Sequence, residues 1–431
     1  MGRLAPALCA FNANIDYVVH LKAPRVAGIA TPRSPPALHE EQDFWDALAQ
    51  CMSLGKSMHV TGSPQIIGWF SKAMKPDEKR AGGQAAIMAN QLAALGGSAV
   101  FSPAILSPLQ AQRMNEKVRV PVAEKGELRF VAPSEAARPQ DVTKINWVFE
   151  FMAGETLRHK GEVITAPRSN RLIVASVVSK EMPLFSEELE PLLPEIGESV
   201  SCSLLAGYHY ISDAEMAKRC ASQLSALRRN KKILLHVEYV PFEHASAAAP
   251  VLREVTKEAK SLGANEAETV EILRALGFGA IADRLKAREN AFVLYDAAKH
   301  VFEHLGLERF HVHNLGYNLV LLKKTANPEK ARDGCVLAAL AASAKAASGK
   351  SFVSQEDLSA LVLSKGLMDA HAFAAEVSDL YHADEKKLLS EGIADMGEHH
   401  LVFVPVPVVE SKTTVGLGDV VSSVALAKEM I

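Results

Sequence analysis

Short hydrophobic runs alternate with longer amphipathic stretches along most of the chain. The runs are rich in valine, isoleucine, leucine and phenylalanine and are at most about eight residues long, which is typical of buried strands. They lie at Leu172–Val178, Leu204–Ala206, Ile233–Val237, Phe310–His313, Leu319–Leu322 and Leu401–Val404. Helical periodicity fills several intervals, as in Asp213–Arg229 and Asn290–Leu305. This succession predicts an α/β fold in which a mainly parallel sheet is flanked by helices on both faces.

Two stretches depart from this alternation. Residues 22–80 are rich in proline, and residues 112–180 consist of short strand patterns separated by polar turns. Both patterns predict a smaller, sheet-rich lid domain beside the main one. We therefore expect residues 1–20, 81–111 and 181–431 to form the large domain, and residues 21–80 and 112–180 to form the lid. A ligand site is expected between them, because pockets gather at domain interfaces and at the carboxyl ends of parallel strands.

Composition narrows the classes of function. The 431 residues include 47 Lys and Arg and 50 Asp and Glu, which gives a net charge of −3. This balance argues against broad binding to nucleic acid or to a membrane surface. The five cysteines show no C-x-x-C spacing, and no apolar run approaches the ~20 residues of a membrane span. We therefore expect reduced thiols and a cytoplasmic protein, whereas the sequence does not indicate an oligomeric state.

The most informative segment lies near the C-terminus, where TTVGLGDV precedes an amphipathic helix predicted at Val421–Met430. Gly416 and Gly418 allow a tight turn with exposed amides, and the helix N-terminus adds partial positive charge. This combination predicts an anion-binding turn. Asp419 stands at the entry to the helix, where it is either an N-cap or a general base beside a bound phosphoryl group.

Two further pairs carry polar atoms suited to metal ions. Asn265 and Glu268 are three residues apart, so a helical turn places both on one face, where Glu268 could hold a magnesium ion or simply face solvent. Glu238 follows the apolar run Ile233–Val237 at the carboxyl end of a predicted strand. His236 lies on the same side of that strand, and a buried core histidine is the alternative for it.

Candidate sugar-binding residues lie near the start of the chain and in the expected lid. Asn14 and Asp16 are two apart and can point to one side, although an Asx turn would explain them equally well. Gly82 and Gly83 precede a helical run at Gln84–Leu95, either as a ligand contact or as a plain helix start. In the expected lid, the two cations suited to a sugar phosphate are Lys144 and Arg171, unless both are surface residues.

These segments together resemble one family. TVGLGD resembles the catalytic motif of the ribokinase superfamily, and the other motifs resemble those of its ADP-dependent sugar kinases. In chain order, the latter are Asn12–Asp16, Gly82–Gln84 followed by Ile87–Asn90, Ile145–Phe151, Arg171–Val174, His236–Glu238 and Asn265–Glu268. The order matches that of the family, and the motifs span residues 12 to 419, which is nearly the whole chain.

The chain thus resembles the archaeal-type ADP-dependent glucokinase and phosphofructokinase family. The resemblance implies a ribokinase-like large domain closed by a lid, Mg²⁺ or another divalent cation, and transfer of the β-phosphoryl group of ADP to a sugar hydroxyl with release of AMP. It implies catalysis by Asp419 with Gly416 and Gly418, and metal binding by Glu268, Glu238 and Asn265. The implied sugar-binding residues are Asn14, Asp16, Gly82, Gly83, Gln84, Lys144 and Arg171. The implied nucleotide-binding residues are His313, Val415 and Gly416, and His311 belongs to the same nucleotide-side segment.

The sugar substrate is less closely defined. The sequence SNRLIV around Arg171 resembles the phosphofructokinase branch, whose lid arginine meets the 6-phosphate. We therefore expect fructose 6-phosphate, with glucose as a second acceptor. The acidic residue that helps to distinguish the two sugars has two candidates, Glu40 and Glu41, either of which could be an exposed helix residue. The alternatives are a glucokinase only, a non-catalytic sugar- or nucleotide-binding regulator, and an ATP-using ribokinase-type enzyme.

Overall fold

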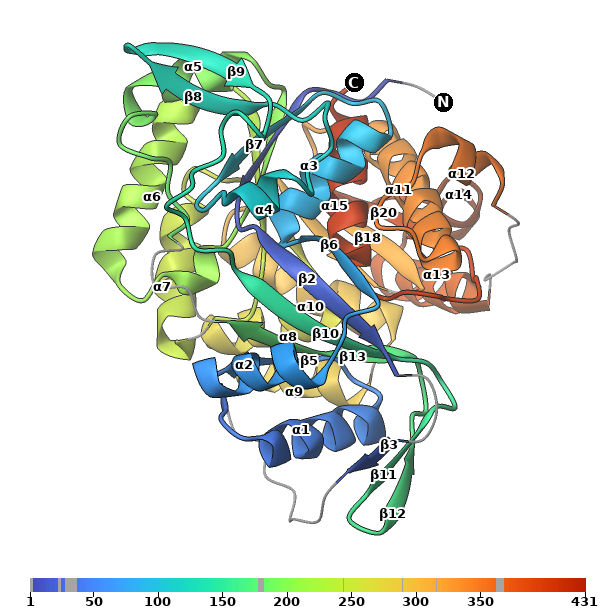
Figure 1. Cartoon of the computed structure of the whole chain (residues 1–431). Coiled ribbons are helices and arrows are strands. Elements are labelled where there is room, and N and C mark those ends of the chain that lie inside the picture. The colour runs from blue at the N-terminus through green and yellow to red at the C-terminus, as the bar shows by residue number, and fades with distance from the viewer. Residues whose placement is uncertain are drawn as a thin grey trace.

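The computed structural model describes residues 3–21, 25–27, 37–176, 182–242, 244–288, 290–314, 316–361 and 368–431. Two sheets dominate it (Figure 1). Within these ranges every helix is too short or too polar to cross a bilayer.

The larger sheet has nine strands. Their spatial order is β19 (Ile393–Asp395), β20 (His399–Pro405), β18 (Tyr317–Lys323), β17 (Arg309–His313), β16 (Ser261–Ala264), β15 (Leu234–Glu238), β14 (Cys202–Ala206), β1 (Ala7–Phe11) and β7 (Ala99–Pro103). The strands from β7 to β17 pair in parallel, whereas β18, β20 and β19 pair antiparallel. This is the mainly parallel sheet that the sequence predicts.

Helices cover both faces of this sheet. In several strands, alternate residues enter different hydrophobic clusters, as Leu8 and Cys9 of β1 do. One face lies under helices α3 (Gln84–Ala94), α11 (Pro328–Ser348) and α15 (Leu417–Glu429). The other lies under helices α5 (Leu193–Glu198), α6 (Ala214–Leu227), α7 (Ala245–Val255), α8 (Glu266–Ala275), α9 (Gly279–Ala287), α10 (Ala291–His304), α13 (Met368–Tyr381) and α14 (Glu385–Glu391). The expected α/β fold class is therefore confirmed.

The second sheet has six strands in the order β4 (Ala37–Leu38), β5 (Met58–Gly62), β13 (Asn170–Ser176), β10 (Ile145–Phe151), β2 (Asn14–His20) and β6 (Glu78–Gly82). Its apolar face, which includes Trp147, Phe149 and Leu172, packs against helices α1 (Glu41–Leu54) and α2 (Pro64–Ala73). Next to it lies a small sheet of β12 (Glu162–Thr165), β11 (Thr156–His159) and β3 (Arg25–Ala27).

The opposite face of the six-stranded sheet carries charged and amide groups. Neighbours in register share a face, so the pairs Asp16 with Arg80, Asn14 with Gly82, and Glu150 with His20 and Arg171 point to the same side. We call this the polar face, and its members used below are Asn14, Asp16, His20, Glu78, Arg80, Glu150 and Arg171.

Sheet membership differs from the expected domain boundaries at three places. Strand β2 and the last two residues of β6 belong to the six-stranded sheet, although we expected residues 1–20 and 81–111 in the large domain. The hairpin of β8 (Val120–Glu124) and β9 (Glu127–Val131) follows a bridge between Val100 and Arg119, next to β7 of the large sheet. The division into two domains itself stays a prediction.

Most predicted elements begin and end within two residues of the observed ones. Residues 177 and 178 of the predicted strand Leu172–Val178 lie outside the described residues. The start of the last helix differs more. Helix α15 begins at Leu417, four residues before the predicted start. Its N-cap is Gly416, so the N-cap alternative for Asp419 is wrong. Asp419 is instead the third residue of the helix. Gly416, with a positive φ, forms the turn that directly precedes the helix.

Candidate active site

Asp419 lies in the first turn of α15, beside backbone amides that have no partner within the helix. Gly416 has a φ of 68°, and a Cβ at this position would lie 3.0 Å from Ile87 Cδ1. The turn therefore requires a glycine both for its conformation and for its contact. Burial raises the pKa of the Asp419 carboxyl to about 7, and the charge of Glu238 acts in the same direction. The nearby charges of His313, Lys345 and Arg171 oppose this rise.

A chain of polar side chains runs from this turn across the ends of β15, β16 and β17. A Cβ at Gly418 would lie 2.9 Å from His313 Cε1, so the His313 ring rests directly against the turn. His313 Nε2 is 2.6 Å from Glu238 Oε1, and His236 Nε2 is 3.1 Å from Glu238 Oε2. His236 Nδ1 is 2.7 Å from the hydroxyl of Ser261. Although burial opposes protonation, Glu238 and its neighbours raise the pKa of His313 above its usual value.

Asn265 and Glu268 form a capping box at the start of α8. The Asn265 side chain accepts from the Glu268 amide at 3.0 Å, and the Glu268 carboxylate accepts from the Asn265 amide at 2.8 Å. Burial raises the pKa of Glu268 to about 8. Glu268 is half-buried and its carboxylate is held in the capping box, and its metal-binding role stays a prediction. Within the described ranges, no three His, Cys, Asp or Glu residues are arranged to hold a metal ion.

The predicted sugar residues of the first two motifs lie together. Asn14 Nδ2 donates to Asp16 Oδ1 at 2.6 Å, and both residues lie within strand β2 rather than in an Asx turn. A Cβ at Gly82 would lie 2.2 Å from Asp16 Oδ1, so only glycine fits opposite this pair. Gly83 has a φ of 81°, and a Cβ there would lie 2.8 Å from Asn12 O. The Gln84 side chain accepts from Asn12 Nδ2, which joins the two motifs.

The two predicted lid cations are not free surface residues. Lys144 is buried, donates to the Tyr210 hydroxyl, and lies 4.7 Å from the centre of the Tyr210 ring. Arg171 is half-buried on the polar face, and its Nε has no hydrogen-bond partner among the described residues. The surface alternative is therefore wrong for Lys144, and the phosphate-binding role of both cations stays a prediction.

Comparison with known proteins places these motifs in a family. A sequence model described as the conserved region of ADP-specific phosphofructokinase/glucokinase matches residues 5–428. The ADP-specific phosphofructokinase of Thermococcus kodakarensis is 30% identical, over 96% of this chain and 93% of the relative. The chain belongs to this family. The ADP-dependent glucose/glucosamine kinase of Pyrococcus abyssi is 28% identical, over 100% of this chain and 95% of the relative.

Solved structures of the family share the fold. An ADP-dependent kinase in complex with fructose-6-phosphate and ADPbetaS superposes with a TM-score of 0.89 at 28% identity, covering 99% of this chain and 94% of that chain. A hypothetical ADP-dependent phosphofructokinase from Pyrococcus horikoshii gives a TM-score of 0.76 at 25% identity, covering 99% and 98%. The α/β architecture expected from the sequence is thus shared with solved ADP-dependent kinases of the family.

Two further predicted positions are less accessible than their expected roles suggest. The Val415 side chain is buried against Val18 and Val148, so that only its backbone could face a nucleotide. His311 is buried within the sheet, where its Nε2 lies 3.1 Å from Asn318 Oδ1. His313 is the member of this segment that lies against the Gly416–Asp419 turn.

Sequence reasoning missed three residues that complete the site. Gly263 lies beside Glu238 in register, and a Cβ there would lie 2.2 Å from Glu238 Oε2. A glycine inside a predicted strand is a signal of such a close approach. Arg80 lies opposite Asp16 and is buried, two residues before Gly82.

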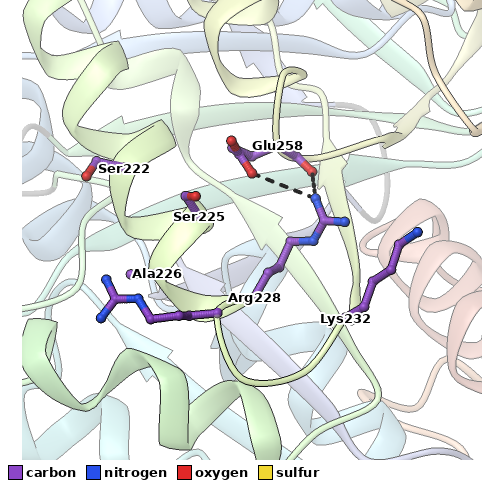
Figure 2. A pocket seen from close by; sticks show the side chains of 7 residues that line it. Ser222, Ser225, Ala226, Arg228, Lys232 and Glu258 are labelled. Atoms are coloured by element: carbon purple, nitrogen blue, oxygen red, sulfur yellow. Dashed lines mark hydrogen bonds and ion pairs between the residues drawn. The ribbon is translucent and has the colours of Figure 1, made fainter.

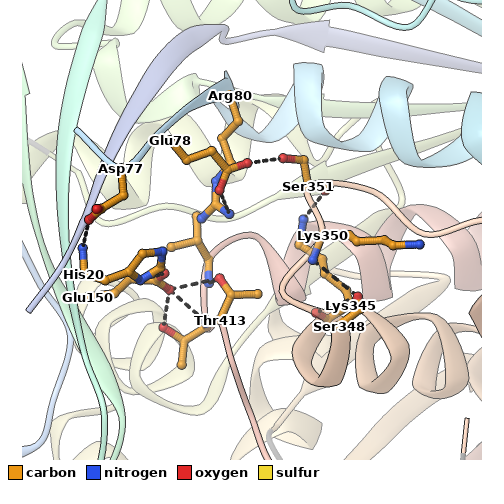
Figure 3. A network of polar contacts seen from close by, with 12 residues as sticks. His20, Asp77, Glu78, Arg80, Glu150, Lys345, Ser348, Lys350, Ser351 and Thr413 are labelled. Carbon is orange, nitrogen blue, oxygen red and sulfur yellow. Dashed lines mark hydrogen bonds and ion pairs between the residues drawn. The ribbon is translucent and has the colours of Figure 1, made fainter. Parts of the chain in front are cut away.

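Lys345 is the third missed residue, a buried lysine in the alanine-rich helix α11. Burial and the charge of Arg80 lower its pKa to about 8, while Asp419 and Asp16 oppose this. Its ammonium group donates to Ser351 O, and the Ser351 hydroxyl donates to Glu78 Oε1 at 2.7 Å (Figure 3). Lys345 is the one charged residue in the alanine-rich stretch 335–348, and this is the signal that could have found it.

A separate surface hollow lies far from these motifs, at the C-terminal end of α6. It encloses about 380 Å³ and is lined by Ser222, Ser225, Ala226, Arg228, Arg229, Lys232 and Glu258 (Figure 2). Arg228 already donates to Glu258 O at 2.9 Å and lies 3.8 Å from the Glu258 carboxylate. We assign the active site to the residues around Asp419 rather than to this solvated patch.

Proposed function

We propose that this family member transfers the β-phosphoryl group of ADP to fructose 6-phosphate and releases AMP, with glucose as a second acceptor. The observation that carries the proposal is the environment of Asp419. Its carboxyl lies in the first turn of α15, the His313 ring rests against that turn at Gly418, and Val415 just before the turn packs against Val18 and Val148 of the six-stranded sheet. A phosphoryl donor and a sugar can therefore meet at one carboxylate.

The reaction follows from these groups. Asp419 takes the proton of the sugar hydroxyl, the sugar oxygen bonds to the β-phosphorus, and the bond from that phosphorus to the oxygen retained by AMP breaks. Amides of the turn at Gly416 and Gly418 stabilise the negative charge that develops on the transferring group. Arg80 and Lys345 are buried cations, and both interact with Asp16. Their positive charges balance the negative charge of the carboxylates and phosphates in the site.

Two pairs of residues recognise the sugar, one at its hydroxyl groups and one at its 6-phosphate. Asp16 accepts hydrogen bonds from sugar hydroxyls, and Asn14 orients that carboxylate. Lys144 and Arg171 bind the 6-phosphate, and the unpartnered Nε of Arg171 supports this role. Glu40 is the N-cap of α1 and Glu41 is the first residue of this helix, so both have a local role at its start. Cytoplasmic location stays a prediction.

The residues present fit a magnesium ion held mostly by phosphate oxygens and water. Both Glu238 oxygens face histidine nitrogens, so Glu268, with one oxygen outside any hydrogen bond in the described structure, is the available carboxylate. Magnesium commonly uses one or two carboxylates together with substrate phosphates. When bound, the ion would neutralise charge on the nucleotide phosphates.

Replacing Glu268 with glutamine should raise the half-saturating Mg²⁺ concentration at least about tenfold. Glutamine preserves the capping box, so the start of α8 should stay intact. The measurement is initial rate against free Mg²⁺, with Glu271→Gln one turn further along α8 as the control. Unchanged Mg²⁺ dependence in Glu268→Gln, or an equal change in the control, would contradict the assignment.

The pH dependence of kcat/KM should reflect the ionisation of the Asp419 carboxyl. Because its pKa lies at about 7 and the base must be ionised, kcat/KM should fall about tenfold per unit once the pH is well below 7. Lys345 lowers this pKa, so Lys345→Met should move the acidic limb to higher pH. Lys350→Met removes an exposed lysine that pairs with Asp357, and it should leave the limb in place. A profile that is flat between pH 5 and 8 would refute the assignment.

The proposed function is tested by crossing donors with acceptors. Rates are measured with ADP or ATP, with fructose 6-phosphate or glucose, and with or without Mg²⁺. We expect ADP with fructose 6-phosphate and Mg²⁺ to give the highest rate. Activity with ATP alone would favour a ribokinase-type enzyme, and binding without turnover would favour a regulator.

A further inference from the structure

Glu150 is a buried carboxylate of the polar face for which the proposed reaction has no assigned role. It is 1% exposed and lies on strand β10, beside His20 and opposite Arg171. One of its oxygens, Oε1, accepts three hydrogen bonds from the segment that leads into the phosphate-binding turn (Figure 3). The donors are the Thr413 hydroxyl at 3.0 Å, the Thr414 amide at 2.9 Å and the Thr414 hydroxyl at 3.3 Å.

The next residue of this segment is held by the same face. Val415 packs with Val18 and Val148, together with the partly buried Ile173. These three residues come from β2, β10 and β13, which are neighbours in the six-stranded sheet. An apolar contact and a set of hydrogen bonds thus seat residues 413–415 on the polar face, directly before Gly416.

The contacts join parts that are distant in sequence. Glu150 and Thr414 are 264 positions apart, and they link the six-stranded sheet to the turn that begins α15. The Thr414 amide is a fixed donor, so its bond to Glu150 sets the path of the backbone that enters the turn. Arg171, directly opposite in register, carries the compensating positive charge.

We propose that Glu150 is a positioning residue for phosphoryl transfer: it holds residues 413–415 so that the Gly416–Asp419 turn presents its amides and carboxylate only while it is seated on the polar face. This inference rests on the proposed function. A turn that is displaced by about 1 Å can cost roughly 10²-fold in rate, because its amides no longer point to where charge develops.

The test compares Glu150→Ala and Glu150→Gln with the wild-type chain. Glu150→Ala should lower kcat about 30- to 100-fold, while the KM for fructose 6-phosphate changes less than about threefold. Glu150→Gln keeps an acceptor oxygen at the same reach and should recover most of that loss. Thr414→Val should add little to Glu150→Ala, because both changes remove the same contact.

The matched control is Asp46→Asn. Asp46 is also a buried carboxylate beside the six-stranded sheet, but it lies on α1 and pairs with His159 at 2.6 Å and Lys160 at 2.7 Å, away from the turn. It should lower thermal stability without lowering kcat. A kcat within twofold of wild type in Glu150→Ala, or no rescue by glutamine, would overturn the proposal.

A second readout separates this inference from the proposed function. Amide hydrogen exchange of residues 414–419 should be faster in Glu150→Ala than in the wild-type chain and unchanged in Asp46→Asn. If the wild-type chain transfers no phosphoryl group, the proposed function fails whatever the exchange shows. If it does transfer the group and exchange is unaltered in Glu150→Ala, only the positioning role fails.

Discussion

Asp419→Asn should lower kcat for ADP-dependent phosphorylation of fructose 6-phosphate by about 10³- to 10⁴-fold, while the Kd for the sugar stays within about threefold. Asparagine has the same shape, so the first turn of α15 and its amides should persist. It cannot accept the hydroxyl proton, and that loss affects the transition state rather than sugar binding. The measurements are steady-state rates and sugar titration by calorimetry.

A matched control exists in another helix. Asp357 occupies the same third position in α12 as Asp419 does in α15. Asp357→Asn should weaken a local cap and leave kcat unchanged. A kcat for Asp419→Asn within about tenfold of wild type would show that another group takes the proton, and it would remove the basis of the mechanism.

Arg171→Met should lower kcat/KM for fructose 6-phosphate by roughly 10²- to 10³-fold, the range expected when one partner of a buried charge pair is removed. The loss with glucose should be much smaller, because glucose has no 6-phosphate. Burial lowers the pKa of the Arg171 guanidinium, but an arginine remains charged in a protein, so the site holds a permanent cation. The comparison is made with both sugars and the same enzyme preparation.

A conservative substitution at the same position tests whether a positive charge alone is sufficient. Arg171→Lys keeps the charge but loses the planar, forked donor arrangement, so it should recover only part of the activity with fructose 6-phosphate. Equal losses with both sugars in Arg171→Met would contradict 6-phosphate recognition. They would place Arg171 at the transferring phosphoryl group instead, consistent with its interaction with Asp419.

The motifs that could be predicted from the sequence are those in which the backbone conformation or a close contact requires a glycine. Gly83 and Gly416 have positive φ, and Gly82 leaves the space that Asp16 occupies. A positive φ is a property of the turn itself, so Gly83 and Gly416 leave a pattern that can be recognised in the sequence. The alternation of short apolar runs with amphipathic stretches likewise reveals a mainly parallel sheet, because period and length are local properties.

Contacts that depend on pairing between distant segments could not be predicted from the sequence. Glu150 meets Thr414 only because β10 lies beside β2 and β13, and nothing near Glu150 in the sequence indicates that order. Arg80 faces Asp16 through the register of β6 with β2. The predicted start of α15 lies four residues after the observed start, because Gly416 and Gly418 obscure the helical pattern there.

Phosphorus NMR of the complete reaction distinguishes phosphoryl transfer to the sugar from hydrolysis of ADP. Wild-type enzyme is incubated with ADP, fructose 6-phosphate and Mg²⁺, and the products are quantified. We expect one AMP and one fructose 1,6-bisphosphate for each ADP consumed, with no free phosphate. Release of inorganic phosphate in place of the bisphosphate, or consumption of ATP but not of ADP, would contradict this expectation.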